Sequence, residues 1–145
     1  MVPGYRRAMS TTREVVTSFL ERLGAGEHEG VAALFAEEVD WRLDWPAGPH
    51  PAVPWVRPRS RREEVAAHFR EIEAHHSPGG GASVSAVLVD GADAVVLAEI
   101  RQTAAPTGRS YTAMCALHFT VEDGRITRYH VYEDSLAVAR AFGAT

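Results

Sequence analysis

The sequence predicts an α+β domain in which one strongly curved, mostly antiparallel sheet forms a cone-shaped barrel wrapped by three to four helices. Three observations predict it. Helix-periodic segments and a single strand come first, four strand-like segments separated by short turns follow, and 145 residues suffice for one buried core. Because long antiparallel strands twist and coil, we expect an apolar cavity under the helices, which is a common place for a small-molecule site.

Composition and charge limit the kinds of binding partner and the cellular location that can be expected. The net charge is −4, and no basic stripe lies beside stacking aromatic residues, so nucleic-acid binding is not expected. Residues 1–10 contain Arg6 and Arg7 but no apolar run after them, which predicts a loose tail and neither a signal peptide nor a membrane span. No membrane partner is expected. Cys115 is the single cysteine and cannot form an intrachain disulfide, which favours a cytoplasmic protein. Residues 11–145 are predicted to form the single domain.

The first helix is expected to begin after Thr11. Thr11 and Glu14 have the spacing of a capping box, in which each side chain accepts a hydrogen bond from the other residue's backbone. The apolar residues that follow fall on one helical face: Val15, Val16, Phe19, Leu20 and Leu23. Gly24 and Gly26 are expected to end this helix.

A short second helix is predicted through Val31, Leu34 and Phe35, and a strand at residues 39–45 follows it. Alternation along this strand places three apolar residues on one side: Trp41, Leu43 and Trp45.

The segment 46–60 is rich in proline and glycine, which excludes regular structure. Trp55 in its middle predicts an ordered loop, because a free tryptophan there would expose a large apolar area. Ser60 is expected to cap a third helix, and glycines 79–81 are expected to link that helix to the next strand. The inward residues of this helix are Val65, His68, Phe69 and Ile72.

The rest of the chain is predicted to be four meandering strands and a last helix. Turn residues separate the strands, which we place at residues 84–89, 94–104, 111–121 and 126–133. Asp134 or Ser135 is expected to cap the last helix, which ends near Gly143.

Three segments carry motifs: ALFAEEVDW at residues 33–41, VPW at 53–55 followed by REEVAAHF at 62–69, and GRI at 124–126 followed by YED at 132–134. Together they resemble the SnoaL-like polyketide cyclases and ketosteroid isomerases over roughly residues 11–143. The resemblance implies the nuclear transport factor 2-like fold, which hosts isomerases, dehydratases, cyclases, epoxide hydrolases and plain binding proteins.

The resemblance places apolar residues where the isomerases have hydrogen-bond donors for the enolate oxygen. The tyrosine of the first helix corresponds to Phe19, the tyrosine of the third helix to Phe69, and the protonated aspartate to Leu117. The loss of one such donor commonly costs about 2.7–4 kcal/mol of transition-state stabilisation, so steroid isomerase chemistry at these positions is not expected. The epoxide hydrolases have an aspartate on the last strand, and the corresponding position here is near Val131. The resemblance to an epoxide hydrolase is therefore weakened as well.

The resemblance leaves the general base open between two positions. The family's aspartate corresponds to Leu43 without a gap and to Asp44 after a shift of one residue, where Asp44, Trp45 and Pro46 resemble the family's motif. Neighbouring strand positions point to opposite faces, so only one register brings a carboxylate inside.

Glu133 is the second candidate for the base. It shares one side of the last strand with Tyr129 and Val131. A carboxyl group there, close to Trp41 and Trp55, would be desolvated, and its pKa would rise toward the range useful for proton transfer. The alternative is that Glu133 lies solvated at the rim.

Each of the large aromatic residues can have either a ligand-binding role or a packing role. Trp41, Trp45 and Trp55 would form a flat wall for a polycyclic ligand, or would anchor the core and the loop. Tyr111 and Tyr129 would orient a ligand oxygen, or would be core rings.

His68 is expected to be a core histidine, with an acid–base role as the alternative. Cys115 and Leu117 are expected to face inward, and no base is identified that would activate the Cys115 thiol. His118 and His130 are expected to face outward, where no further ligand completes a metal site, so neither a metal nor another cofactor is expected. The resemblance implies a homodimer formed through this outer sheet face.

Three functions remain open. The first is a cofactor-independent enzyme that moves a proton in the cyclisation, isomerisation or dehydration of a hydrophobic, carbonyl-bearing, polyketide- or terpenoid-like molecule. The second is a binding protein for such a molecule, and the third is a dimeric interaction domain. The predicted catalytic residues are Asp44, Glu133, His68 and Tyr129, and the predicted substrate contacts are Phe19, Trp41, Trp45, Trp55, Phe69, Tyr111, Cys115, Leu117 and Val131.

Overall fold

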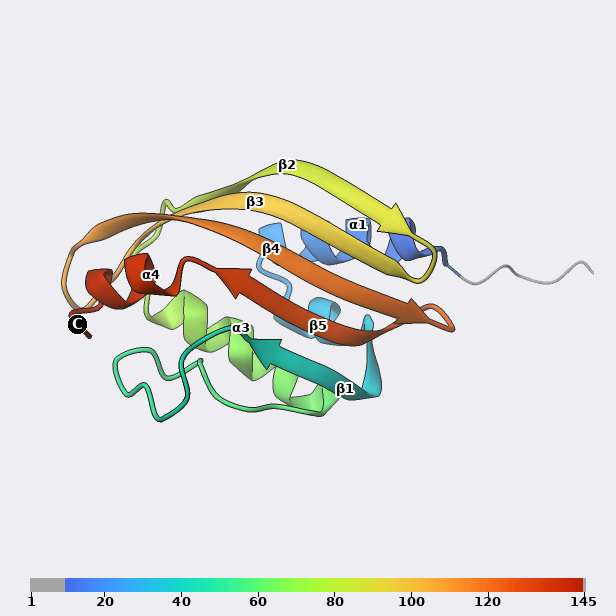
Figure 1. Cartoon of the computed structure of the whole chain (residues 1–145), viewed down its shortest axis with the longest axis horizontal. Helices are drawn as coiled ribbons and strands as arrows, with labels where there is room; N and C mark the ends of the chain where they lie inside the picture. The colour runs from blue at the N-terminus through green and yellow to red at the C-terminus, as the bar shows by residue number, and fades with distance from the viewer. Residues whose placement is uncertain (1–9, 145) are drawn as a thin grey trace, which may run out of the picture.

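The computed structural model describes residues 10–144 and shows the predicted order of elements (Figure 1). The predicted loose tail lies, apart from Ser10, outside the described residues. The elements are α1 (Thr12–Gly24), α2 (His28–Ala32), β1 (Phe35–Leu43), the 3₁₀ turn η1 (Arg62–Glu64), α3 (Val65–Ala74), β2 (Gly81–Asp90), β3 (Asp93–Thr103), β4 (Ser110–Glu122), β5 (Arg125–Glu133) and α4 (Ser135–Ala141).

All five strands belong to one sheet with the order β1-β5-β4-β3-β2. The β1 strand pairs parallel with β5, and the other pairs are antiparallel. Register shifts interrupt the β1–β5, β2–β3 and β4–β5 pairs, and such bulges increase the local twist of a sheet. The predicted α+β fold with a curled, cone-like sheet is therefore confirmed, although the sheet stays open and does not close into a barrel.

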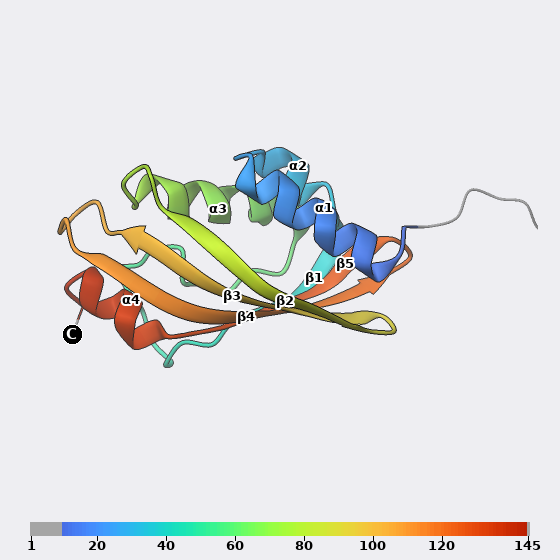
Figure 2. The same ribbon diagram turned by 90° about the horizontal axis from the view of Figure 1, so that it is seen from above.

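Helices α1, α2 and α3 lie on one side of the sheet, as the view from above shows (Figure 2). The α1 helix packs on β2, β3 and β4, while α4 packs on β4. We call the sheet surface that faces α1 and α3 the inner face, and the opposite surface the outer face.

Local sequence explains where several elements begin and turn. The hydroxyl of Thr11 accepts from the Glu14 backbone, and the Glu14 carboxylate accepts from the Thr11 backbone, so the predicted capping box is present. Asp123 and Gly124 both have positive φ, of 51° and 74°, as a tight turn between antiparallel strands requires. Asp134 caps α4 by accepting from the Ala137 backbone.

Two predicted boundaries are wrong. The second helix already ends at Ala32, and Phe35 begins β1; a short apolar run fits a helix and a strand equally well. Ser60 does not cap the third helix. Instead, the carboxylate of Glu64 accepts hydrogen bonds from the backbones of Ser60 and Arg61.

Aromatic rings fill the space between α1, α3 and the sheet. The ring of Phe19 is fully buried, and its centroid lies 4.9–6.2 Å from the rings of Phe35, Phe69, Phe119 and Tyr129. Edge and tilted contacts of this kind add to the free energy gained from burying the rings. The prediction of an apolar cavity under the helices is therefore wrong at this end of the sheet, because side chains fill the space.

A second apolar cluster lies at the other end of the sheet, where the segment 46–60 and α4 meet β4. Trp55 is 5% exposed, and its ring meets the ring of Phe142 edge to face with the centroids 5.2 Å apart. The backbone of Val39 donates to Ser60, which ties the end of this segment to β1. The segment is thus irregular but anchored, as predicted from Trp55.

Within residues 10–144, no helix is both long and apolar enough to cross a membrane.

Candidate functional site

The inner face of β5 carries Tyr129, Val131 and Glu133, because successive strand residues alternate between faces. Pairing places Tyr129 opposite Trp41 and Val131 opposite Leu43 of β1, while Glu133 lies opposite Cys115 of β4. The strand thus carries an apolar row that ends in a carboxylate.

Glu133 is partly buried at the end of this row. Its Oε1 accepts a hydrogen bond of 2.8 Å from the indole Nε1 of Trp45. Burial raises the pKa of the Glu133 carboxyl group, the Trp45 donor opposes this shift, and the charge of Asp134 adds to it. A carboxyl group with a raised pKa is suited to accept and return a proton.

The side chain of Asp44, the residue after β1, lies on the opposite side of the chain from Glu133 and the inner face. Its side chain is exposed, while its backbone nitrogen donates to the Val131 carbonyl at 2.9 Å and extends the β1–β5 pairing. This register leaves Leu43 and Trp45 on the inner side together with Trp41, as the alternation along the strand predicted. The catalytic role of Asp44 stays a prediction, but the geometry favours Glu133 as the inward carboxylate.

Tyr111 and His76 form a hydrogen-bonded pair close to Glu133. The Oη of Tyr111 lies 2.7 Å from Nε2 of His76, and Nδ1 of His76 lies 2.6 Å from the carbonyl oxygen of Ile72. Burial, and then the charge of Glu133, raise the pKa of Tyr111, while burial lowers the pKa of His76. Both groups are therefore neutral near pH 7.

Cys115 faces Glu133 across the β4–β5 pair. Burial, with a contribution from the charge of Glu133, raises the pKa of the Cys115 thiol to about 11. The thiol is protonated at neutral pH and is not a nucleophile.

His68 is buried among aromatic rings. Its ring centroid lies 4.7 Å from that of Trp41 and 4.8 Å from that of Phe69. Burial lowers the pKa of His68 to about 3, the charge of Arg59 contributes, and a hydrogen bond with the Trp55 backbone acts in the opposite direction. His68 is therefore a neutral core histidine, and its catalytic role stays a prediction.

The remaining predicted ligand contacts divide between the two clusters. Phe19, Phe69, Tyr129 and Val131 are buried in the aromatic core, with Trp41 and Leu117 packed against it. Burial raises the pKa of Tyr129, with contributions from Cys115 and Glu133. Trp55 is buried in the second cluster, and Tyr111 and Trp45 pack against it. The structure thus brings Glu133, Trp45, Tyr111 and Cys115 toward one end of the inner face, and the ligand contacts of all these residues stay predictions.

Two grooves lie on the surface of the described residues, away from Glu133. One of about 430 Å³ is lined by Glu38, Val39, Asp40, Ser60 and Arg61. The other, of about 320 Å³, lies between α2 and η1. Neither is lined by Glu133, so the carboxylate best suited to chemistry lies apart from both.

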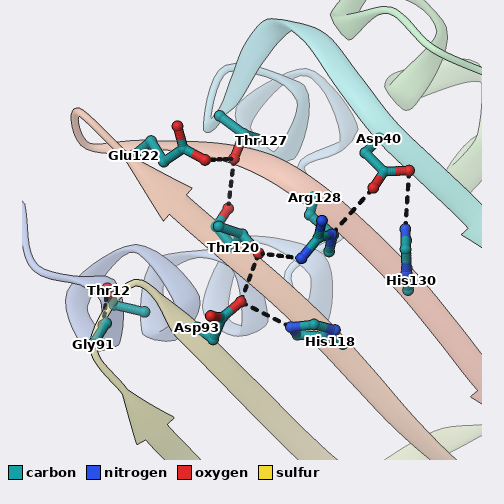
Figure 3. Close-up of polar contacts among 10 residues, drawn as sticks. All are labelled: Thr12, Asp40, Gly91, Asp93, His118, Thr120, Glu122, Thr127, Arg128 and His130. Carbon is teal, nitrogen blue, oxygen red and sulfur yellow. Dashed lines mark hydrogen bonds and ion pairs between the residues drawn. The ribbon is translucent and has the colours of Figure 1, made fainter.

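The outer face carries a polar network rather than a candidate site (Figure 3). Asp40 contacts His130 at 3.0 Å and Arg128 at 3.1 Å, and Asp93 contacts His118 at 2.9 Å. These contacts lower the pKa of both aspartates, mainly through the His130 hydrogen bond for Asp40 and the Thr120 hydrogen bond for Asp93. In the part of the chain that the structure describes, no group of three or more His, Cys, Asp or Glu side chains is placed to hold a metal ion.

Sequence reasoning missed His76 and Arg59. His76 lies at the end of α3, 35 residues before Tyr111, so no local pattern pairs them. Arg59 looks like a surface residue of a polar loop, yet only 6% of it is exposed, and its guanidinium donates to the Glu64 carbonyl and lies 3.6 Å from the Glu71 carboxylate.

The curled five-stranded sheet and the helices on one of its faces define a protein of the nuclear transport factor 2-like fold. The chain belongs to the SnoaL-like domain family, whose model matches residues 16–129. No curated protein matches the chain.

Solved structures of other proteins are similar over nearly the whole chain. An NTF2-like protein of unknown function from Burkholderia pseudomallei K96243 is 25% identical, with 92% of this chain and 98% of that chain covered and a TM-score of 0.79. An NTF2-like protein from Burkholderia thailandensis E264 is 19% identical at the same coverage and TM-score. TerC co-crystallised with polyporic acid is 16% identical, covers 92% and 99%, and has a TM-score of 0.77. The last two show similarity of fold alone.

Proposed function

We propose that this protein is a cofactor-independent enzyme that moves a proton on a hydrophobic, carbonyl-bearing small molecule of the polyketide or terpenoid kind. Glu133 acts as the acid–base group. The observation that carries the proposal is the partly buried Glu133 carboxyl group, whose pKa is raised by burial and whose Oε1 is held by Trp45. The crystallisation of TerC with polyporic acid supports a fold that accommodates a small organic molecule.

The chemistry needs one group that alternates between base and acid. The Glu133 carboxylate removes a proton from the carbon next to the substrate carbonyl and becomes a carboxylic acid, while the substrate becomes an enolate. The acid then returns the proton: to a different carbon in an isomerisation, to the oxygen of the attacked carbonyl in a cyclisation, or to the hydroxyl group that leaves as water in a dehydration. The indole N–H of Trp45 donates a hydrogen bond to Oε1 of Glu133 and so fixes the orientation of the carboxylate. The proton from the substrate is then taken by the other carboxylate oxygen. Apolar neighbours such as Val131 and Tyr129 keep the base poorly solvated.

Hydrogen–deuterium exchange tests the proposal without knowledge of the product. In D₂O, the purified protein is expected to exchange the hydrogens next to the carbonyl in at least one member of a panel of polycyclic ketones and β-keto compounds. Mass spectrometry measures the incorporation. If panel members bind but none exchanges faster than in buffer, the protein is a binding module and the enzyme proposal is wrong.

We further propose that a second copy of the chain covers the outer face. Large apolar side chains are exposed there: Met114 is 61% exposed, Leu88 56% and Tyr132 42%. Sedimentation velocity at micromolar concentration is expected to show a homodimer, and Met114→Glu combined with Tyr132→Glu is expected to convert it to a monomer because charges would be desolvated in the interface. Wild-type protein that sediments as a monomer would refute this interface.

A further inference from the structure

The His76–Tyr111 pair fixes which way the Tyr111 hydroxyl group points. The carbonyl oxygen of Ile72 can only accept a hydrogen bond, and it lies 2.6 Å from Nδ1 of His76. Nδ1 therefore carries the hydrogen. A neutral imidazole has one hydrogen, so Nε2 is an acceptor, and the Tyr111 hydroxyl at 2.7 Å must donate to it.

His76 is held in this form by its surroundings. Its ring packs between aromatic groups, with centroids 5.4 Å from Trp55 and 5.2 Å from Phe142. No carboxylate within residues 10–144 forms an ion pair with it, and neighbouring His75 acts against its protonation. Its backbone pairs with Ala104, which anchors the end of α3 to the sheet.

The Tyr111 oxygen can also be approached from the side that does not face His76. With its only hydrogen donated to His76, the phenol oxygen offers lone pairs to anything that approaches from the other side. Tyr111 lies on the same inner face of β4 as Cys115, which pairs with Glu133, and it is only partly buried. Glu133 is near enough for its charge to add to the effect of burial in raising the pKa of Tyr111. A ligand group that forms a hydrogen bond with this oxygen must therefore be the donor.

We propose that His76 is a positioning residue that makes Tyr111 a hydrogen-bond acceptor, so that the site selects ligands with a hydroxyl group and not ligands with only a carbonyl at that position. The inference rests on the proposed function only in placing the ligand beside Glu133. It narrows the substrate class to hydroxylated carbonyl compounds, in which a hydroxyl group donates to Tyr111 while Glu133 acts on the carbon next to the carbonyl.

The hydrogen-bond direction is testable without a substrate. Nitrogen-15 NMR of histidine-labelled protein is expected to show His76 neutral, protonated at Nδ1 and unprotonated at Nε2. Tyr111→Phe is expected to shift the Nε2 resonance because its donor is lost, while Tyr132→Phe on the outer face leaves it unchanged. A hydrogen on Nε2 of His76, or an Nε2 resonance that Tyr111→Phe does not move, would overturn the inference.

A matched pair of probes tests the selectivity. We expect 2-naphthol to bind roughly five- to tenfold more tightly than 2-methoxynaphthalene, the gain typical of one hydrogen bond, and to lose this advantage in Tyr111→Phe. Equal binding of the two probes to the wild-type protein, or failure of both to bind, would refute the hydroxyl-selective site. A naphthol preference without any deuterium exchange on ketones would refute the catalytic proposal and leave the selectivity intact.

Discussion

Glu133→Gln is expected to slow enzyme-dependent deuterium exchange by about 10²–10⁴-fold, the usual contribution of a positioned acid–base group. Glutamine has nearly the same shape, and its carbonyl oxygen accepts the Trp45 hydrogen bond as the carboxylate does. It cannot take a proton at neutral pH. The loss should therefore appear in kcat, while the fold and the binding of naphthalene probes are retained.

Two matched variants separate Glu133 from the other carboxylates. Asp44→Asn tests the alternative base directly, and because the Asp44 side chain is exposed, we expect it to retain exchange. Glu37→Gln, at an exposed position of β1, is the surface control. If Asp44→Asn abolishes exchange and Glu133→Gln does not, the base is Asp44 and the inner-face assignment is wrong.

Acidification is expected to destabilise the protein through His68. Its pKa is about 3 in the folded state and about 6.5 in an unfolded chain, so the unfolded state binds the proton more readily between these values. The stability due to neutral His68 is complete above pH 6.5 and is lost as the pH falls toward 3. Between about pH 7.5 and pH 4.5 this single group should lower the free energy of unfolding by about 2–3 kcal/mol.

Urea unfolding at both pH values measures this effect. In His68→Leu, which keeps an apolar side chain against Trp41 and Phe69, the fall in stability on acidification should shrink by that amount. His50→Gln, a change in the segment 46–60, should leave the fall unchanged. An equal acid loss in wild type and His68→Leu would show that His68 is not the buried neutral group described above.

Much of the fold was predictable because its elements follow local rules. The capping box of Thr11 fixed the start of α1, and turn residues such as Gly124 separated the last strands. Alternation along β5 predicted that Glu133 would share a face with Tyr129 and Val131. These inferences need only the chain's own periodicity.

The candidate site was less predictable because it depends on contacts between distant segments. Phe19 and Phe69 are apolar whether they line a cavity or fill it, so their packed arrangement could not be predicted from the sequence. The hydrogen bond between His76 and Tyr111 joins α3 to β4 and depends on how the two elements cross. The one-residue choice between Leu43 and Asp44 needed the observed β1–β5 register.

The titration of Glu133 tests the account most directly. Carbon-13 NMR of the glutamate side-chain carboxyl groups, with the Glu133 resonance assigned by its absence in Glu133→Gln, gives its pKa in the folded protein. We predict a midpoint above the ordinary value of 4.5, because burial disfavours the charged form more than Trp45 stabilises it. A midpoint at or below 4.5 would mean that the carboxylate is solvated at the rim, and it would contradict the proposal that Glu133 is the acid–base group.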